Sequence, residues 1–457
     1  MKSYDAEQAW AQARRFLDDN PDIETIEVFL TDLNGISRGK WIPRDELESV
    51  CRGNYKISVC AVTPDVWGND VPSLCEFTGD ADGITLPVID TLKRVPWLKK
   101  PTAQLMLEMT RDGDYCEWDP RVVLRKVVQR YQQRGLTAVM APELEFYLFE
   151  PSSLEAGAPC LPDSRMNSRT HIGGQLYSTD MLRDHAEMLH AMRDACVALG
   201  VPATAIGKEL SAGQWELNQG HVDSPLDAAD QAQTLKRCIR NVAKDFGLMA
   251  SFIAKPSADL DGNGLHVHFS LLDESGKNVF DDGSDKGSEV LRHALGGLAA
   301  TMSDTMLVMM PHMNSFRRMR IGGHAPKAPT WGYENRYVAM RIPDGPPDSR
   351  RIEHRVAGAD ANAYLVLAVM LAGALYGIDN KLDPGEPSAD RESGESSADM
   401  LPSNWYRALD EFDTSDFVRD YLGAEFKHAF SELKHFEQQQ FDSIISREEY
   451  DTYLATV

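Results

Sequence analysis

The chain has 457 residues, which is enough to bury a large core and to form two domains. Acidic residues outnumber lysine and arginine by 70 to 47, and the net charge of -23 disfavours nucleic acid and anionic membranes as partners. The 7 cysteines are scattered and form no CxxC pair, so we expect free thiols in a reducing, cytoplasmic environment.

The N-terminal part of the chain is predicted to form a helix followed by strands. Residues 1–20 have the amphipathic spacing of a helix and lack the apolar core of a signal peptide. Residues 23–33 have the pattern of a strand, and Asn34-Gly35 after them is a typical hairpin turn. Residues 103–109 are predicted to form a further strand.

We place a domain boundary near residue 108, between an N-terminal domain (1–108) and a larger domain (109–457). In the larger domain, Asp119 before Pro120 predicts the start of a helix, and helical patterns recur at 179–199 and 227–246. Helices that alternate with strands predict an α+β or α/β fold. The apolar run 363–378 is interrupted by Gly373 and is short for a membrane span, so we expect a buried helix there.

Polar and apolar side chains alternate in three separate segments of the larger domain. If these segments are strands, each directs its polar side chains to one face of a sheet. The polar positions are Glu143 and Glu145, His266 and His268, and Arg351, Glu353 and Arg355. A fourth segment, 208–216, adds Glu209 and Glu216.

The glutamates of these segments, together with His266, are candidate metal ligands. Carboxylates that lie close together repel one another and take up protons unless a cation lies between them. Oxygen ligands with one imidazole and no thiolate suit Mg²⁺ or Mn²⁺ better than Zn²⁺. Mg²⁺ usually shares its coordination sphere with substrate phosphates.

An arginine-rich stretch overlaps the segment that contains Glu353. Between Arg317 and Arg355 there are eight arginines and four acidic residues, although the chain as a whole is acidic. Guanidinium groups suit phosphate and carboxylate, so the stretch predicts an anionic ligand. Each pattern alone also has a simpler interpretation: a solvated strand face for the glutamates, ordinary strand positions for the histidines, and surface ion pairs for the arginines.

Three short motifs suggest other chemistry but lack the required context. Residues 35–39 match the GxSxG nucleophile motif, but no helical pattern follows them. Gly207-Lys208 lacks both the first glycine and the Ser/Thr of a phosphate loop, and Gly262-Asn-Gly264 does not continue to the third glycine of a dinucleotide-binding motif. We therefore predict none of these three sites.

Taken together, the motifs resemble those of the glutamine synthetase superfamily over most of the chain. The matching pieces are the Glu143-Leu-Glu145 segment, Glu209 to Glu216 around Gly-Gln, Gly262-Asn-Gly-Leu-His-Val-His268, Asn314-Ser-Phe-Arg-Arg318, Asn335-Arg336, Arg341-Ile-Pro343 and Arg351-Ile-Glu-His-Arg355. Each piece is weak alone, but their order and spacing together are specific. Residues 331–336 and 353–362 are most similar to the γ-glutamylpolyamine (γ-glutamylputrescine) synthetases, which join the side-chain carboxylate of glutamate to an amine.

The resemblance implies an α+β fold with an N-terminal β-grasp-like domain and a larger catalytic domain, in which helices flank a curved antiparallel sheet. It also implies two or more Mg²⁺ or Mn²⁺ ions per active site, with ATP as co-substrate. Glu145, Glu209 and Glu216 would hold one ion, and Glu143, His266 and Glu353 would hold the other.

The same resemblance assigns the remaining site residues. The residues expected to act in catalysis are Arg336, Arg341, Arg351, Asp65 and His324; those around glutamate are Asp261, Gly262, Arg318 and Arg355; those around the nucleotide are His268, Ser270, Arg341 and Arg351. Asp65 is the candidate for contact with the amine, and Asp70 is its rival. The expected reaction forms γ-glutamyl phosphate, which a primary amine such as putrescine then attacks, in polyamine catabolism.

The chain also departs from the family pattern. His324 stands where ammonia-using members have a glutamate on the flap that closes the active site, which argues against ammonia as the substrate. Asp348 replaces a lysine found near the nucleotide in bacterial glutamine synthetases, so ATP contacts there are not carried over. The tyrosine motif that is adenylylated in some enteric enzymes has no counterpart at 380–402, and we expect no such regulation.

Two alternatives stay open at this stage. One is a glutamine synthetase that uses ammonia, which amine preference would distinguish. The other is a non-catalytic structural or regulatory family member, which should have lost metal ligands, whereas this chain keeps all six. The resemblance finally implies a homo-oligomer, a dodecamer of two hexameric rings with active sites between neighbouring subunits.

Overall fold

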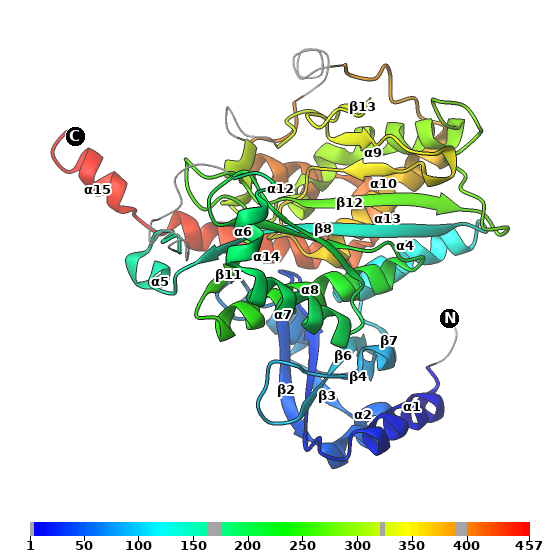
Figure 1. Ribbon diagram of the computed structural model, residues 1–457, viewed down its shortest axis with the longest axis vertical. Coiled ribbons are helices and arrows are strands. Elements are labelled where there is room, and N and C mark those ends of the chain that lie inside the picture. Colours follow the sequence, from blue (N-terminus) through cyan, green and yellow to red (C-terminus); the bar gives the residue numbers. More distant parts are fainter. Residues whose placement is uncertain (1–3, 163–174, 320–324, 390–399) are drawn as a thin grey trace.

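The computed structural model describes residues 4–162, 175–319, 325–389 and 400–457. These residues form two β-sheets with helices around them, which confirms the predicted α+β class (Figure 1). Figure 1 shows the N-terminal sheet, in blue, below the larger helix-covered sheet that contains β8 and β12.

The first sheet has seven strands in the order β2-β1-β6-β4-β3, with β5 and β7 also paired to β6. Its strands are β1 (Thr25–Thr31), β2 (Ser37–Pro43), β3 (Lys56–Ser58), β4 (Asp82–Pro87), β5 (Lys93–Arg94), β6 (Thr102–Arg111) and β7 (Asp114–Tyr115), and its helices are α1 (Ala6–Asp19), α2 (Leu47–Cys51) and α3 (Pro72–Thr78). β1 pairs with β2 antiparallel and with β6 parallel.

The predicted hairpin turn is present, and Gly35 adopts the positive φ of 77° that favours glycine. The boundary near residue 108 stays a prediction, since β6 extends beyond it to Arg111.

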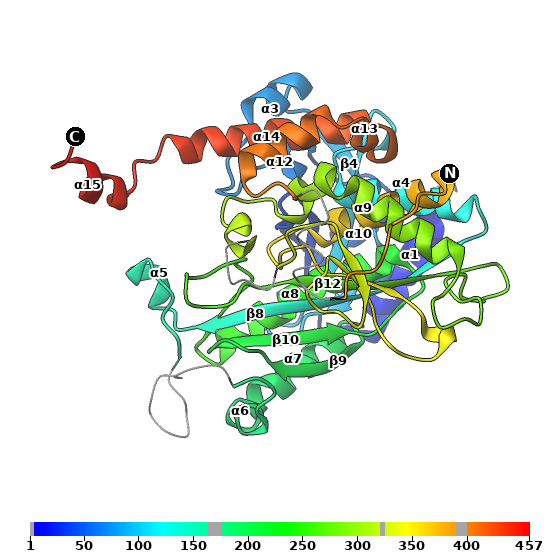
Figure 2. The same ribbon diagram turned by 90° about the horizontal axis from the view of Figure 1, so that it is seen from above.

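The second sheet has eight strands in the order β13-β14-β15-β12-β8-β10-β9, with β11 also paired to β8. Its strands are β8 (Thr137–Phe149), β9 (Ala203–Lys208), β10 (Gln214–Gln219), β11 (Met249–Ser251), β12 (Leu265–Leu272), β13 (Trp331–Tyr333), β14 (Met340–Ile342) and β15 (Ile352–His354). Figure 2 shows β12, β8, β10 and β9 side by side. The described pairs are antiparallel, except that β13 and β14 run parallel.

The remaining helices cover this sheet or lie beside it, except α15, which projects away. They are α4 (Pro120–Gln132), α5 (Ser153–Ala156), α6 (Thr179–Asp184), α7 (Ala186–Ala198), α8 (Pro225–Asp245), α9 (Glu289–Met309), α10 (Ala363–Asn380), α12 (Trp405–Thr414), α13 (Asp416–Leu422), α14 (Ala424–Asp442) and α15 (Arg447–Tyr453). Asp119 caps α4 as predicted, because its side chain accepts a hydrogen bond from the Arg121 amide. The helix predicted at 179–199 is instead two helices that meet at His185.

Helix α10 is apolar and long enough to cross a membrane by length and composition, but 78% of it is buried within the protein. It packs against α9, α4 and α8. The sequence prediction of a buried helix at this position is therefore confirmed. Asn362 caps the start of the helix, because its side chain accepts from the Tyr364 amide. The same side chain donates to the carbonyl oxygen of Asp32, which directly follows β1.

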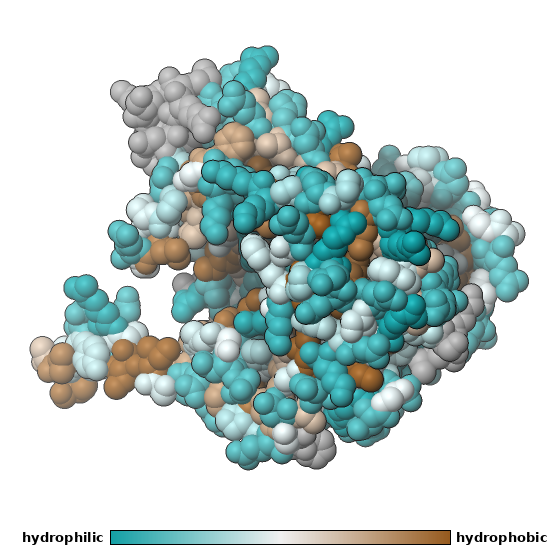
Figure 3. Space-filling model, turned by 90° about the horizontal axis from the view of Figure 1, so that it is seen from below, coloured by the Kyte–Doolittle hydropathy of each residue, from teal (hydrophilic) through white to brown (hydrophobic). Residues whose placement is uncertain are grey.

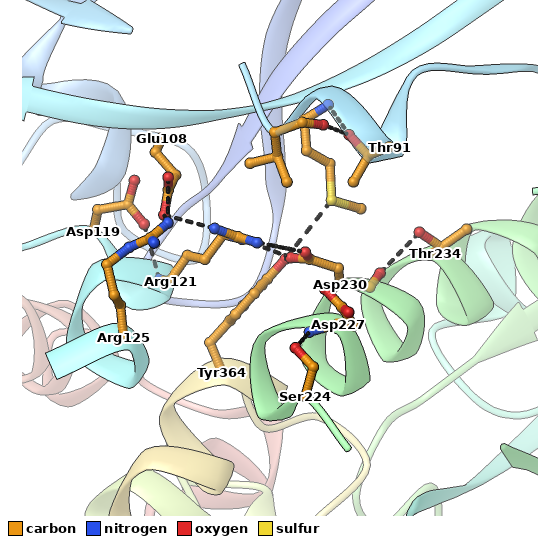
Figure 4. Close-up of polar contacts among 12 residues, drawn as sticks. Thr91, Glu108, Asp119, Arg121, Arg125, Ser224, Asp227, Asp230, Thr234 and Tyr364 are labelled. Carbon is orange, nitrogen blue, oxygen red and sulfur yellow. Dashed lines mark hydrogen bonds and ion pairs between the residues drawn. The ribbon is translucent and has the colours of Figure 1, made fainter. Parts of the chain in front are cut away.

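A buried cluster of charges joins the first sheet to the helices of the larger domain (Figure 4). Arg121 of α4 donates to Glu108 of β6 at 2.7 Å and to Asp230 of α8 at 2.8 Å. Tyr364 of α10 donates to the second oxygen of Asp230 at 2.6 Å, and Arg125 pairs with Glu108. One guanidinium therefore compensates two buried carboxylates from different elements.

The C-terminal helix α15 projects away from the rest of the molecule (Figures 1 and 2). Figure 3 shows apolar residues on this projection. Ile444, Ile445 and Leu454 are exposed there.

Replacement of Arg121 with Met should strongly destabilise the fold. The side chain keeps much of its volume but loses its charge, which leaves Glu108 and Asp230 buried without full compensation. We expect the free energy of unfolding to fall by about 3–5 kcal/mol, measured by urea denaturation. The matched control is Arg52→Met, since Arg52 also bridges two carboxylates, Glu7 and Glu48, but at the surface. Equal effects of the two substitutions would contradict the role assigned to the cluster.

Candidate active site

Strand register brings distant carboxylates together on one face of the second sheet. β8 lies between β10 and β12, so Glu145 is opposite Glu216 on one side. On the other side, Glu143 is opposite His266. Directly opposed side chains have Cβ atoms about 4.5–5.5 Å apart and lie on the same face. The prediction that these segments are strands with polar residues on one face is confirmed for β8 and β12, and β10 adds Glu216 to the same face.

The row of polar side chains continues across the next two strands. Glu353 of β15 is opposite His268 of β12 and also opposite Arg341 of β14. The Nη1 atom of Arg341 donates to Glu353 Oε2 at 2.6 Å, and Arg355 pairs with the other oxygen of Glu353. Glu353 therefore lies between two guanidinium groups.

The structure places all six candidate metal ligands around one cavity of about 410 Å³. Glu209 enters it from the turn that follows β9. The arginines that line the cavity are Arg336, Arg341, Arg351 and Arg355, and His268 lines it too. The acids and the arginines come from segments that are far apart in the chain, and the fold brings both groups to this one cavity.

The ligand atoms that lie nearest one another differ from the two sets that the family resemblance predicts. One group with atoms within 4.8 Å contains Glu143, His268 and Glu353, and another contains Glu143, Glu216 and His266. The predicted sets instead combine His266 with Glu353, and Glu145 with Glu209. The division of these residues between two metal ions therefore stays a prediction.

The contacts of His268 indicate its tautomer. Arg351 Nε donates to His268 Nδ1 at 3.2 Å, so Nδ1 is the acceptor. The proton on the imidazole then lies on Nε2, which is 3.2 Å from Glu143 Oε1. In this arrangement His268 holds Glu143 in place. Burial lowers the pKa of His266, with Arg355 adding to the effect, so its imidazole is neutral and able to bind a metal.

The carboxylates of β8 and β10 repel one another, and the pKa values of Glu145 and Glu216 are raised. Burial, followed by repulsion from Glu143, Glu145 and Glu209, raises the pKa of Glu216 to about 9. Burial and repulsion from Glu209 raise the pKa of Glu145 to about 7. A cation between these groups would remove the repulsion, so the donor set fits a divalent metal that prefers oxygen.

Glu353 differs from the other carboxylates. Burial raises its pKa, but the guanidinium groups of Arg355 and Arg341 outweigh this effect and lower the pKa to about 2. Glu353 therefore stays ionised at neutral pH. It can bind a cation without first releasing a proton.

A larger cavity of about 980 Å³ adjoins the first and shares Glu145, Glu209 and His266 with it. The predicted glutamate residues Asp261, Gly262, Arg318 and Arg355 all line it. Arg318 is buried, and it donates to the Val356 carbonyl oxygen at 2.8 Å. Gly264 lies beside the site without a side chain because a Cβ there would be 2.7 Å from His266 Nε2.

Three predicted residues, Ser270, Asp65 and Asp70, are not among the described residues that line these cavities. Ser270 lies on β12 but is not among the described residues that line either one. Asp65 is fully buried in its own loop, where its carboxylate accepts from the Trp67 and Asn69 amides at 3.0 and 2.8 Å. Asp70, its rival, is exposed. His324 lies outside the described residues.

Sequence reasoning missed two polar residues of the site. Asn218 donates to Glu143 at 2.9 Å, and Gln214 donates to the Gly262 carbonyl oxygen at 3.1 Å. Both lie two residues from Glu216 on β10. Extension of the strand alternation from Glu216 in both directions would have found them.

Comparison with known proteins identifies the family to which the chain is similar. Residues 117–453 match the family model described as glutamine synthetase, catalytic domain. The chain is 36% identical to γ-glutamylputrescine synthetase of Escherichia coli strain K12, over 97% of this chain and 94% of that protein. It is 32% identical to glutamate–isopropylamine ligase of a Pseudomonas species, over 95% of each. A solved structure of a GmaS/ADP complex superimposes with a TM-score of 0.84 at 26% identity, covering 97% of this chain and 99% of that one.

Metal binding should release protons in a pH-dependent way. Below pH 9 Glu216 is protonated in the metal-free protein, and a metal must displace that proton, so lower pH weakens binding. We expect the apparent affinity for Mn²⁺ to rise about tenfold per pH unit from pH 7 to 8.5. Calorimetry in buffers of different ionisation enthalpy measures the protons released. The Glu216→Gln variant should release fewer, and unchanged release would contradict the assignment.

Proposed function

The chain belongs to the glutamine synthetase family, and we propose that it is a ligase that uses ATP to join the side-chain carboxylate of glutamate to a primary amine. One observation carries this proposal: the candidate metal ligands and four arginines surround one cavity, and the predicted glutamate residues line the adjoining one. The similarity to two enzymes named as ligases of glutamate with amines supports it. The similarity to an ADP complex supports a nucleotide as co-substrate.

In the proposed reaction, the glutamate side chain first attacks the γ-phosphorus of ATP, which releases ADP and forms γ-glutamyl phosphate. The neutral amine then attacks the acyl carbon, and phosphate leaves. A carboxylate alone is a poor acyl donor, so the phosphorylation makes the second step possible. Two or more Mg²⁺ or Mn²⁺ ions, held by the six candidate ligands, would neutralise charge on the phosphates.

The arginines of the site act on the anionic groups of the reaction. Arg336, Arg341 and Arg351 would stabilise the negative charge of the transferred phosphoryl group. Arg318 and Arg355, with Asp261 and Gly262, would orient glutamate. Arg341 now pairs with Glu353 and also with Glu334 at 3.0 Å, which holds its side chain at the cavity before an anion arrives.

We propose putrescine or another polyamine as the amine, and a role in polyamine catabolism. The similarity to γ-glutamylputrescine synthetase supports this choice. The replacement of the flap carboxylate by His324 in the sequence also supports it, because a neutral or cationic imidazole does not favour a small bound ammonium. Asp65 or Asp70 would contact the amine from a neighbouring subunit. A glutamine synthetase that uses ammonia is the second candidate, and the retained ligands disfavour a non-catalytic family member.

A panel of amines with glutamate and ATP tests the substrate. We expect putrescine or a longer polyamine to give a higher kcat/KM than ammonium, because each buried CH₂ contributes about 0.8 kcal/mol. Release of phosphate and mass spectrometry of the product measure the reaction. The Glu353→Gln variant serves as the control, since it keeps its volume but loses its charge and should be inactive with every amine. A higher kcat/KM for ammonium would favour glutamine synthetase.

We further propose a cytoplasmic homododecamer of two hexameric rings, in which active sites lie between subunits. Of the two candidate residues, Asp70 is exposed and lines neither cavity of its own chain, in keeping with a contribution from a neighbouring subunit, whereas Asp65 is fully buried. Size-exclusion chromatography with light scattering under assay conditions should therefore show a large oligomer. A fully active monomer would exclude sites shared between subunits.

A further inference from the structure

Four large apolar side chains border the larger cavity and remain exposed. They are Leu176 (47% exposed), Tyr177 (63%), Leu210 (41%) and Tyr337 (50%), and we call them the apolar collar. Single exposed apolar residues are common, but a group of them at one cavity indicates a ligand with apolar surface. Glutamate is strongly anionic, and ammonium has no hydrocarbon, so neither would benefit from such a collar. The adenine of ATP has apolar surface, but the predicted nucleotide residues His268, Arg341 and Arg351 line the smaller cavity.

The collar is assembled from three separate segments of the chain. The Tyr177 amide donates to the Lys208 carbonyl oxygen at 3.0 Å, which holds Leu176 and Tyr177 beside the turn that carries Leu210. Tyr177 has a φ of 57°, an unfavourable conformation for a residue with a side chain. Such strain is often found where a side chain is held for binding. Tyr337 reaches the cavity from the loop after β13.

The collar is continuous with the cluster of carboxylates. Tyr177 lines both cavities, and so does Glu209, which directly precedes Leu210. A ligand whose hydrocarbon chain lies on the collar therefore has one end near Glu145 and Glu209. An amine group at that end meets negative charge, while its methylene groups leave water.

We propose that the apolar collar binds the hydrocarbon chain of the amine substrate and so selects alkylamines over ammonium. This inference rests on the proposed ligase function. The cavity of about 980 Å³ has the size of sites for molecules well above ammonia. The collar contributes through the area that it buries, so the preference should increase with chain length until the chain extends past the collar.

A homologous series of primary amines tests the collar. For ammonium, methylamine, ethylamine, propylamine and butylamine, we expect kcat/KM of the wild type to rise about fourfold per CH₂, which corresponds to about 0.8 kcal/mol. The variants Leu176→Asn and Leu210→Asn keep the branched shape and the number of side-chain heavy atoms but replace apolar surface with an amide. In each variant the increase per CH₂ should fall below about twofold.

Leu154→Asn is the matched control, since Leu154 is exposed but is not among the described residues that line the cavity. Its chain-length dependence should equal that of the wild type. Thermal unfolding and light scattering of each variant check folding and assembly. A wild type that forms no product with any amine would refute the ligase function itself.

Two results would refute the collar while leaving the ligase function intact. In the first, the wild type is active, and both collar variants keep its dependence on chain length. In the second, the variants change the size of the oligomer but not this dependence, which would identify the collar as a contact between subunits.

Discussion

Repulsion between carboxylates on one face of the second sheet is the constraint on which the site depends. Glu145 and Glu216 are opposite one another on adjacent strands, and Glu209 approaches them from a turn. Strand pairing keeps the backbone in place, so the side chains cannot separate far enough to escape one another. Protons relieve the repulsion in the metal-free protein, and a divalent cation would do so more effectively. The fold therefore holds the site in a form that favours cation binding.

Glu353 shows how the same sheet supplies the opposite electrostatic environment. It lies on the same face as the crowded carboxylates, but Arg341 and Arg355 pair with it from both sides. The arginines thus remain at the cavity when no anion is present. An incoming phosphate would compete for these guanidinium groups, while a cation would compete for Glu353. In the proposed reaction, the phosphate and the cation would therefore each bind residues that are already ionised.

The position of the first sheet is linked to the site through buried polar contacts. Arg121 joins β6 to α8, and Asn362 joins the start of α10 to the hairpin of β1 and β2. Asn362 follows the strand β15 that carries Glu353 by only a short segment. A shift of the first sheet would therefore break buried hydrogen bonds close to the candidate site. Such breaks are costly because water does not replace the lost partners.

The sequence by itself determined the local features and the chemical types of the site residues. Asp119 before Pro120, Asn34-Gly35 and the alternation around Glu143 each act over a few neighbouring residues, so their consequences follow from the order of amino acids. The family resemblance added the roles of residues such as Arg336 and Glu209, which local patterns do not reveal.

Only the tertiary structure decided which of these residues meet. Glu143 is opposite His266 because of strand order, and a backbone hydrogen bond from Tyr177 to Lys208 joins two distant segments that line the larger cavity. The two partners of Arg121 likewise come from separate elements, β6 and α8. The raised pKa of Glu216 and the lowered pKa of Glu353 follow from the same packing. Burial and neighbouring charge depend on contacts between remote segments, and no local pattern of residues encodes them.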